Sequence, residues 1–349
     1  MSRRTNNVYK PKMTAFLIAT IMLVLVVIVI LMSTILILSA GKGEATTTPA
    51  YSWTPSYSNP VVTTTKAPVV TTTPATTTTK NPDVPDTPVI PGTTIVVKDL
   101  TDSKIGSLVL VDKNHFYTRD GLVPRGSMNT TTASLLGFGA LSGGTGNYKL
   151  SKGSMYLDLD ARSAFNKMME DLAAVAESGD VQVRNAYYYS ADLTAITDQD
   201  SLETVEHSTG FVLDLEINKE GKIYPLNFPS MKAKFYDWLL ENCWKYGFIH
   251  LRDTGSYSTF RYIGIPHAAM LHKDAQLNFQ NYLTMLTAYN IDNKLKVTDS
   301  TGAEWWIYYV KAENNAVNVP VYGDESVYQI SGDNVGGFVV AINSSKLAK

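Results

Sequence analysis

An uncharged apolar run, Met13 to Gly41, limits which part of this chain can fold as a globular unit. The run is longer than the roughly 20 residues that cross a bilayer core, and longer than the apolar core of a secretory signal, about 7–15 residues. Four basic residues lie before it, within 1–12, and Lys42 follows it. This bias predicts a cytoplasmic N-terminus (1–12), an uncleaved single-pass anchor (13–41) and an extracellular remainder at the cell membrane.

The segment 42–92 is dominated by Thr, Pro and Val, as in the run 69–80. Such a composition cannot bury enough apolar surface to offset the entropy that is lost on ordering. Because proline at this density favours extended conformations, we expect an extracellular stalk that separates the anchor from the folded part of the chain.

The charge and the cysteine count exclude several classes of protein. The net charge of −2 and the pI near 6.2 provide no basic footprint for nucleic acid, so we expect no nucleic-acid partner. Cys243 is the only cysteine, which rules out an internal disulfide. It lies in a helical pattern of apolar residues, and we predict a buried, unreactive thiol.

The apolar pattern of the folded part mixes helices and strands without a βαβ repeat. Helical spacing predicts helices at 160–178 (with Asp160 as the cap and the methionines in the core), 229–247 and 266–289. Strand patterns occur at 94–97, 108–111, 181–189, 211–217, 248–251, 260–263, 305–310, 327–330 and 338–340. We therefore predict an α+β fold, with one domain over 93–290 and a small C-terminal β extension over 291–349.

The stretch Glu206–Leu215 carries the strongest chemical signal in the chain. His207 and Asp214 stand close together in it, with Gly210 between them. A neutral imidazole nitrogen and a carboxylate oxygen both bind zinc at about 2 Å, so this pair is the candidate set of metal ligands.

The same stretch resembles the metal motif Ser-x-His-x-x-Gly-x-x-x-Asp of the D-alanyl-D-alanine carboxypeptidases of the vancomycin-resistance type. Three further segments are similar to that family in order and spacing, namely 108–115, 238–249 and 260–268. The resemblance implies an antiparallel sheet flanked by helices, as in hedgehog-type and D,D-peptidase folds, with zinc as the cofactor. It also implies that the partner is the D-Ala-D-Ala end of a peptidoglycan stem peptide in the cell wall.

The family's remaining catalytic groups are absent where the resemblance places them. Its third zinc ligand and general base belong to a Glu-Pro-Trp-His run before Phe260, where this chain has Ser256–Thr259. Its oxyanion arginine corresponds to Tyr188, unless Arg184 reaches in from a shifted position. Two ligands are too few for a tetrahedral zinc site, and a general base typically supplies 10²–10⁴-fold of rate. The prediction therefore keeps the two candidate metal ligands and names no catalytic residue.

The residues alone leave two alternatives open. His207 and Asp214 are either an inherited hydrogen-bonded pair without metal or a weak, partial zinc site. His250 is either a replacement ligand or a half-exposed strand residue. In both cases we expect His207 and Asp214 a few ångströms apart at one edge of an antiparallel sheet. We expect the helix 230–246 to pack behind that sheet, with the side chains Trp238, Leu239 and Cys243 buried.

Three functions fit these features. The first, which we predict, is a membrane-anchored pseudoenzyme that binds a stem peptide or a cell-wall protein without cutting it. The alternative is an active zinc D,D-carboxypeptidase that trims peptidoglycan with a rearranged ligand set. The third is an adhesion module that binds through the aromatic run 305–309, although alternating aromatic residues in a strand usually serve packing.

Overall fold

The computed structural model describes residues 92–117, 128, 130–142, 146–176, 178–188, 194–232 and 234–347. All of them belong to one compact unit, Thr54–Lys349. The predicted N-terminus, anchor and stalk lie outside the described residues, Gly92 excepted. Within the described residues, no helix combines the length and the apolar character that a bilayer crossing requires.

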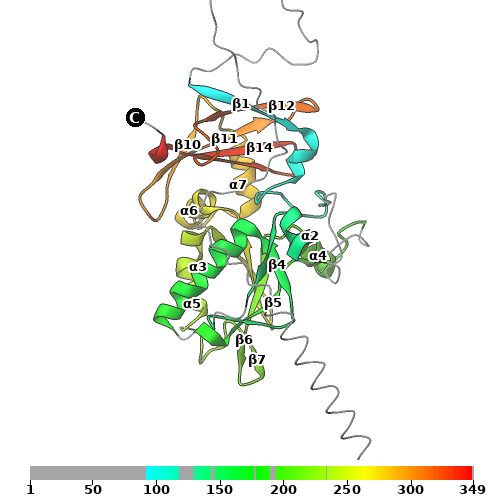
Figure 1. Cartoon of the computed structure of the whole chain (residues 1–349), viewed down its shortest axis with the longest axis vertical. Coiled ribbons are helices and arrows are strands. Elements are labelled where there is room, and N and C mark those ends of the chain that lie inside the picture. The colour runs from blue at the N-terminus through cyan, green and yellow to red at the C-terminus, as the bar shows by residue number, and fades with distance from the viewer. Residues whose placement is uncertain are drawn as a thin grey trace, which may run out of the picture. The chain divides into compact units, whose positions relative to one another are not determined.

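A six-stranded sheet forms the centre of the region between residues 149 and 262 (Figure 1). Its strands are β3 (Lys149–Leu150), β5 (Val181–Asn185), β6 (Val212–Lys219), β9 (Ser258–Tyr262) and β8 (Phe248–Asp253) in that spatial order, with β7 (Lys222–Pro225) paired to β6. Every pair is antiparallel except β3 with β5. The α+β class and the antiparallel sheet flanked by helices are therefore confirmed.

Helix α3 (Leu159–Val175) covers one face of this sheet with an apolar stripe. Met168, Met169 and Leu172 are fully buried there, as the helical spacing predicted. The predicted cap at Asp160 is wrong. Asp158 is the N-cap instead, because its carboxylate accepts a hydrogen bond from the backbone N–H of Asp160.

A second helix, α5 (Tyr236–Asn242), continues as a 3₁₀ turn, η5 (Cys243–Tyr246), and begins later than the predicted residue 229. It ends at Gly247 as predicted, where φ is 84° and a Cβ atom would lie 2.8 Å from the ring of Tyr262. Leu239 and Cys243 are buried, as predicted. Trp238 is only half-buried, so its predicted burial is wrong.

The single helix predicted over 266–289 is two helices, α6 (Ile265–Lys273) and α7 (Phe279–Leu286). The chain turns between them because Asp274 leaves the helical region and Asn278 starts a new helix, accepting a hydrogen bond from the N–H of Asn281. The remaining small elements are α2 (Thr130–Leu135), β2 (Phe138–Leu141) and β4 (Met155–Asp158), of which the two strands pair.

The C-terminal residues form a separate four-stranded antiparallel sheet in the order β10, β11, β14, β13, and a two-stranded sheet of β1 with β12. The bounds are β1 (Thr93–Asp99), β10 (Leu295–Thr298), β11 (Glu304–Lys311), β12 (Ala316–Tyr322), β13 (Tyr328–Gly332) and β14 (Gly337–Asn343). Strand β1 thus pairs with the C-terminal residues although it opens the predicted domain 93–290.

The predicted strand 108–111 is wrong, although Leu108 and Val109 are fully buried. The backbone groups of this segment form hydrogen bonds with groups that do not belong to a paired strand. The N–H of Leu110 donates to the carbonyl of Asp333, and the buried guanidinium of Arg261 donates to the carbonyl of Val109. These contacts tie the C-terminal sheet to the central sheet, because Arg261 belongs to β9.

Candidate functional site

Helix α4 (Gln199–Ser208) and the start of β6 bring the two predicted ligands together. Asp198 and Ser201 cap the helix reciprocally, which fixes its start. Gly210 makes the turn between the two elements with φ at 80°, and a Cβ atom there would lie 2.1 Å from the ring of Phe138. The glycine of the motif is therefore required by the backbone and by the close packing, independently of any metal.

His207 and Asp214 face each other inside the protein. The Nε2 atom of His207 lies 3.2 Å from Oδ2 of Asp214, and both side chains are 1% exposed. The Nδ1 atom of His207 lies 2.8 Å from the carbonyl oxygen of Glu203 and donates a hydrogen bond to it. The contact with Asp214 is an ion-pair contact and not a well-directed hydrogen bond, because the buried Nε2 makes no hydrogen bond of normal geometry.

Neighbouring side chains complete the hydrogen bonds of the Asp214 carboxylate. The amide of Asn185 donates to Oδ2 at 2.8 Å, and the hydroxyl of Thr259 donates to Oδ1 at 2.8 Å. The hydroxyl of Tyr188 donates to the Asn185 carbonyl, and its ring packs against His207 with 5.1 Å between centroids. The carboxylate therefore meets three protein partners without a metal ion.

Burial by itself disfavours the charged forms of both side chains. The negative charge of Asp214 outweighs burial and raises the pKa of His207 above its ordinary value. Burial also tends to raise the pKa of Asp214, but the charge of His207 and the bonds from Asn185 and Thr259 lower that pKa below its ordinary value. The surroundings thus favour an imidazolium–carboxylate pair.

A pocket of about 270 Å³ opens beside this pair. Its lining residues are Asn185, Tyr188, Asp200, Glu203, Thr204, His207 and Asp214. Four of them share one face of α4, since positions 200, 203, 204 and 207 recur at helical spacing. The sequence reasoning missed Asp200, Glu203 and Thr204 because it assigned no helix to 199–208, and that spacing was the signal available.

Thr259 occupies the position where the resemblance places the third zinc ligand. It pairs directly with Asp214 in the register of β6 and β9, and it is fully buried. A histidine there would point toward the pair, but the hydroxyl of Thr259 instead donates to the carboxylate. The counterpart of the general base, Ser256, is exposed on the turn before β9.

The residues present fit a zinc ion only in part. Two ligands of a tetrahedral ion with bonds of about 2.0–2.2 Å stand roughly 3.3 Å apart, close to the 3.2 Å between His207 and Asp214. A protein zinc site needs at least one more side-chain ligand. Over the described ranges, no group of three or more His, Cys, Asp or Glu residues is arranged to hold a metal ion.

The arginine alternative also fails in the structure. Arg184 pairs with Glu216 at 3.0 Å and lies over the ring of Tyr257 at 4.9 Å, so it is not a lining residue of the pocket. Tyr188 does line the pocket, but a phenol supplies no permanent cation for an oxyanion.

His250 lies in a different cluster from the candidate pair. Its Nε2 atom is 3.1 Å from Asp253, and its ring packs edge-on against Tyr236, on strand β8. It does not line the pocket beside His207. Within the described part of the chain, His250 is therefore a half-exposed strand residue and not a replacement ligand for the His207 pair.

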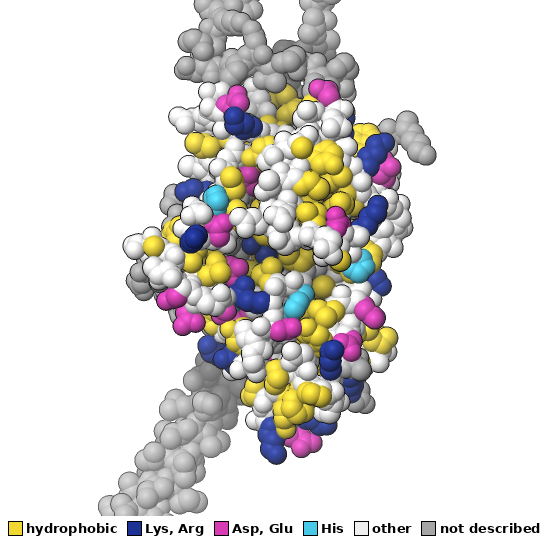
Figure 2. All heavy atoms as spheres, turned by 180° about the vertical axis from the view of Figure 1, so that it is seen from behind, with side chains coloured by type: hydrophobic (Ala, Val, Ile, Leu, Met, Phe, Trp, Pro, Cys, Tyr) yellow, Lys and Arg dark blue, Asp and Glu magenta, His cyan; other side chains and the backbone are white. Residues whose placement is uncertain are grey.

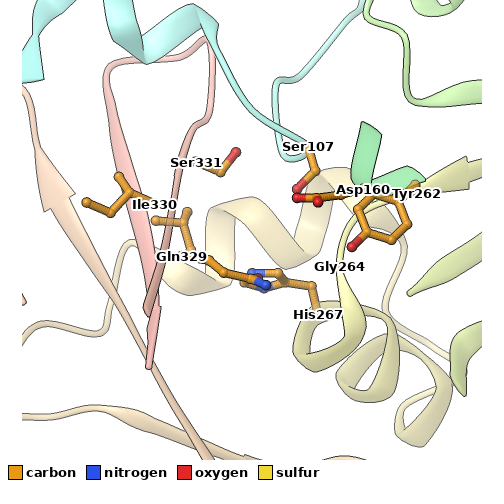
Figure 3. Close-up of a pocket in the computed structure, with 9 residues that line it drawn as sticks. Ser107, Asp160, Tyr262, Gly264, His267, Gln329, Ile330 and Ser331 are labelled. Atoms are coloured by element: carbon orange, nitrogen blue, oxygen red, sulfur yellow. The ribbon is translucent and has the colours of Figure 1, made fainter. Parts of the chain in front are cut away.

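A second, much smaller cavity lies between α6 and β13 (Figure 3). Figure 3 shows Gln329 of β13 reaching toward His267 of α6, with Asp160 and Tyr262 on the other side. His267 is 3% exposed and its Nδ1 atom is 2.7 Å from the hydroxyl of Tyr282. The cavity volume of about 10 Å³ has room for about one water molecule and no larger ligand.

Comparison with known proteins supports the fold. No family model matches the sequence. The chain is 27% identical over 221 residues to a D-alanyl-D-alanine carboxypeptidase of Enterococcus faecium, an alignment that covers 56% of this chain and only 64% of that protein. It is also similar to the solved vancomycin-resistance D,D-dipeptidase VanXYg in complex with a D-Ala-D-Ala phosphinate analogue. The TM-score is 0.53 and the identity 22%, over 72% of this chain and 98% of the other.

Proposed function

We propose that the chain is a catalytically impaired member of the D,D-peptidase family of the vancomycin-resistance type, to which its sequence and fold are similar. It carries a D-Ala-D-Ala peptidase-like domain whose pocket binds a peptidoglycan stem peptide, or a cell-wall protein, without cleaving it. The apolar run 13–41 and the Thr/Pro-rich segment 42–92 support a membrane anchor and an extracellular stalk that present this domain to the cell wall.

One observation carries the proposal. Thr259 stands in strand register with Asp214, at the third-ligand position, and uses its hydroxyl to hold the carboxylate. A zinc ion in a peptidase lowers the pKa of its bound water and polarises the substrate carbonyl. Here His207 and Asp214 are the two residues that would hold such an ion, and among the described residues no third ligand completes the site.

The chain's own residues support binding better than turnover. A base must stand within about 2.6–3.2 Å of the proton that it abstracts. Glu203, a carboxylate in the pocket, already accepts a hydrogen bond from the hydroxyl of Tyr257 at 2.7 Å. Its other oxygen lies 3.5 Å from the guanidinium of Arg252, so both carboxylate oxygens already have partners. Glu203 is therefore a fixed acceptor and not a poised base.

The test combines metal analysis with an activity assay on the purified full-length chain. We expect less than stoichiometric zinc after dialysis and no D-alanine release from a stem pentapeptide. Binding of that peptide should still be measurable by calorimetry, and weaker in His207→Ala. Stoichiometric zinc together with D-alanine release that His207→Ala abolishes would overturn the proposal and establish the alternative, an active carboxypeptidase with a rearranged ligand set.

A further inference from the structure

Among the described residues, strand β1 has a strand neighbour on only one of its two edges. It pairs with β12 along its whole length, from Thr93 to Asp99 (Figure 1). An edge strand offers backbone N–H and C=O groups to another strand, and proteins usually protect such an edge with charged side chains, proline or a bulge. The central residues 94–97 contain no charge and no proline, and their pairing with β12 has no bulge. The edge of β1 is therefore suited to the addition of a further strand.

The two faces of β1 differ in burial, because side chains alternate along a strand. Val96 packs against the apolar core of the C-terminal sheets and pairs with Val319 of β12. Ile95 and Val97 belong to the other face, where they are 38% and 62% exposed. Removing apolar surface from water stabilises an association by about 25 cal/mol per Å². Strand β1 thus combines an accessible edge with two uncovered apolar side chains on one face.

A second copy of the chain matches β1 in one antiparallel register. With a twofold axis at Val96, Ile95 of each copy lies opposite Val97 of the other, so the exposed apolar side chains meet on the same face. In that register Lys98 lies opposite Thr94, and no two like charges face each other. The strand is therefore complementary to itself, as a twofold interface requires.

Other registers cover the exposed side chains less well. A slip by one residue brings the outward Ile95 opposite the inward Val96, so the apolar surfaces of the two copies lie on different faces. A slip by two residues in one direction puts Val97 opposite Thr93. In the other direction it puts Ile95 opposite Asp99. The register centred on Val96 is the one that covers both exposed apolar side chains at once.

The charges of the molecule favour no oppositely charged partner. The net charge is −2, and the face shown in Figure 2 mixes basic and acidic side chains without a large area of one sign. Backbone pairing gives affinity without net charge, and the side chains beside it select the register. A second copy supplies both the matching edge and the matching apolar pair.

We propose that two copies of this chain pair through their β1 strands about a twofold axis at Val96. The strands β12 and β1 of one copy then continue into β1 and β12 of the other as one four-stranded antiparallel sheet. The inference goes beyond the stem-peptide function and does not depend on it. The anchor proposed for 13–41 would hold both copies in one plane and raise their effective concentration.

Disulfide crosslinking of the full-length chain in detergent micelles tests the register. Cys243 does not interfere, because it is buried and burial raises the pKa of its thiol to about 12. Val96→Cys places two thiols at the axis, with Cα atoms about 4.5–5.5 Å apart, and we expect a covalent dimer on oxidation. Thr94→Cys is the matched control, since its two copies lie about 13 Å apart along the strands, too far for a disulfide.

A mixture of two variants repeats the test at exposed positions, so that the core is not touched. Ile95→Cys and Val97→Cys should form a mixed disulfide when the two chains are combined, because these positions lie opposite each other across the axis. Each variant alone should give little dimer, since its two copies lie roughly 8 Å apart. Equal crosslinking of Val96→Cys and Thr94→Cys would refute the inference. So would a mixture that does not crosslink, and this second result decides the matter if Val96→Cys does not fold.

Sedimentation of the full-length chain in micelles measures the association itself. Val97→Lys should weaken it about tenfold or more, because the substitution brings a charge into the apolar contact with Ile95. Val175→Lys is the control, since Val175 is 66% exposed on α3 and should not affect association. An unmodified chain that sediments as a monomer at every concentration would overturn the inference. Association that Val97→Lys leaves unchanged would do so too, because the contact would then lie elsewhere in the chain.

Discussion

Two buried histidines in different regions of this protein meet opposite electrostatic surroundings. His207, between α4 and β6, faces a carboxylate at 3.2 Å, and its pKa is raised. His267, on α6 beside the C-terminal sheet, contacts the hydroxyl of Tyr282 at 2.7 Å, and burial lowers its pKa to about 3. Their exposed fractions are 1% and 3%, so burial alone does not decide the charge of a histidine.

The two surroundings differ in their energetic cost to the folded protein. A histidine that only fills space in a core is stable as the neutral ring, as His267 is. The carboxylate beside His207 costs desolvation energy that an apolar pair of similar size would not. Asn185 and Thr259 offset part of this cost, because both donate hydrogen bonds to the Asp214 carboxylate.

The largest expected effect follows from giving the His207 region a third ligand. Thr259→His adds an imidazole in strand register with Asp214, and we expect zinc affinity to rise by about 100-fold or more. D-alanine release should remain absent, because Ser256 supplies no base. Calorimetric zinc titration measures the affinity, and Thr298→His, on an exposed strand position, is the control. An unchanged zinc affinity in Thr259→His would contradict the assignment of position 259 to the third zinc ligand.

The second effect compares two His–Asp pairs that differ in burial. His207→Ala leaves Asp214 as a buried, uncompensated charge and should cost about 3–5 kcal/mol of unfolding free energy. His250→Ala breaks a pair at 3.1 Å whose side chains are 24% and 30% exposed, and should cost below about 1 kcal/mol. Urea unfolding of both variants measures the difference. Similar costs would show that the buried pair contributes no more than the exposed one.

The third effect is the pH dependence that His267 imposes. Its pKa in the folded state, about 3, lies below its unfolded value of about 6.5, so the unfolded chain binds the extra proton first. The contribution of neutral His267 to the free energy of unfolding is fully present above pH 6.5. It is lost as the pH falls, and the loss amounts to about 3 kcal/mol at pH 4.

His267→Gln should remove this part of the pH dependence, because glutamine does not titrate. His272→Gln is the control, since its ring is exposed and stacks on Trp244. Urea unfolding at pH 7, 5 and 4 gives the slopes. The same slope in His267→Gln and the unmodified chain would contradict a neutral, buried His267.

The smallest effect tests the phenol partners of the two histidine regions. Tyr282→Phe leaves the buried Nδ1 of His267 without its partner and should cost about 1–3 kcal/mol. Tyr188→Phe removes a hydroxyl that donates to Asn185, which in turn bonds Asp214, and should cost about 1 kcal/mol. Thermal unfolding of both variants ranks them. The reverse order would place more of the stability in the Tyr188–Asn185 contact than the structure indicates.

Local patterns predicted the helix α3, the turn at Gly247 and the burial of Cys243 correctly, because each depends on neighbours in sequence. The strand predicted at 108–111 failed for the opposite reason. Its apolar residues are buried, but their backbone partners, Arg261 and Asp333, lie far along the chain.

For the candidate site, the sequence by itself determined the pair His207–Asp214 and the substitution of the Glu-Pro-Trp-His run, since both are spacings within short motifs. Only the tertiary structure decided that Thr259 bonds the carboxylate, that Arg184 lies outside the pocket, and that Asp200 and Glu203 line it. The physical reason is that strand register and helix packing bring together residues from 185 to 259. The charge and the hydrogen-bond partners of a buried side chain depend on that assembly and not on its neighbours in sequence.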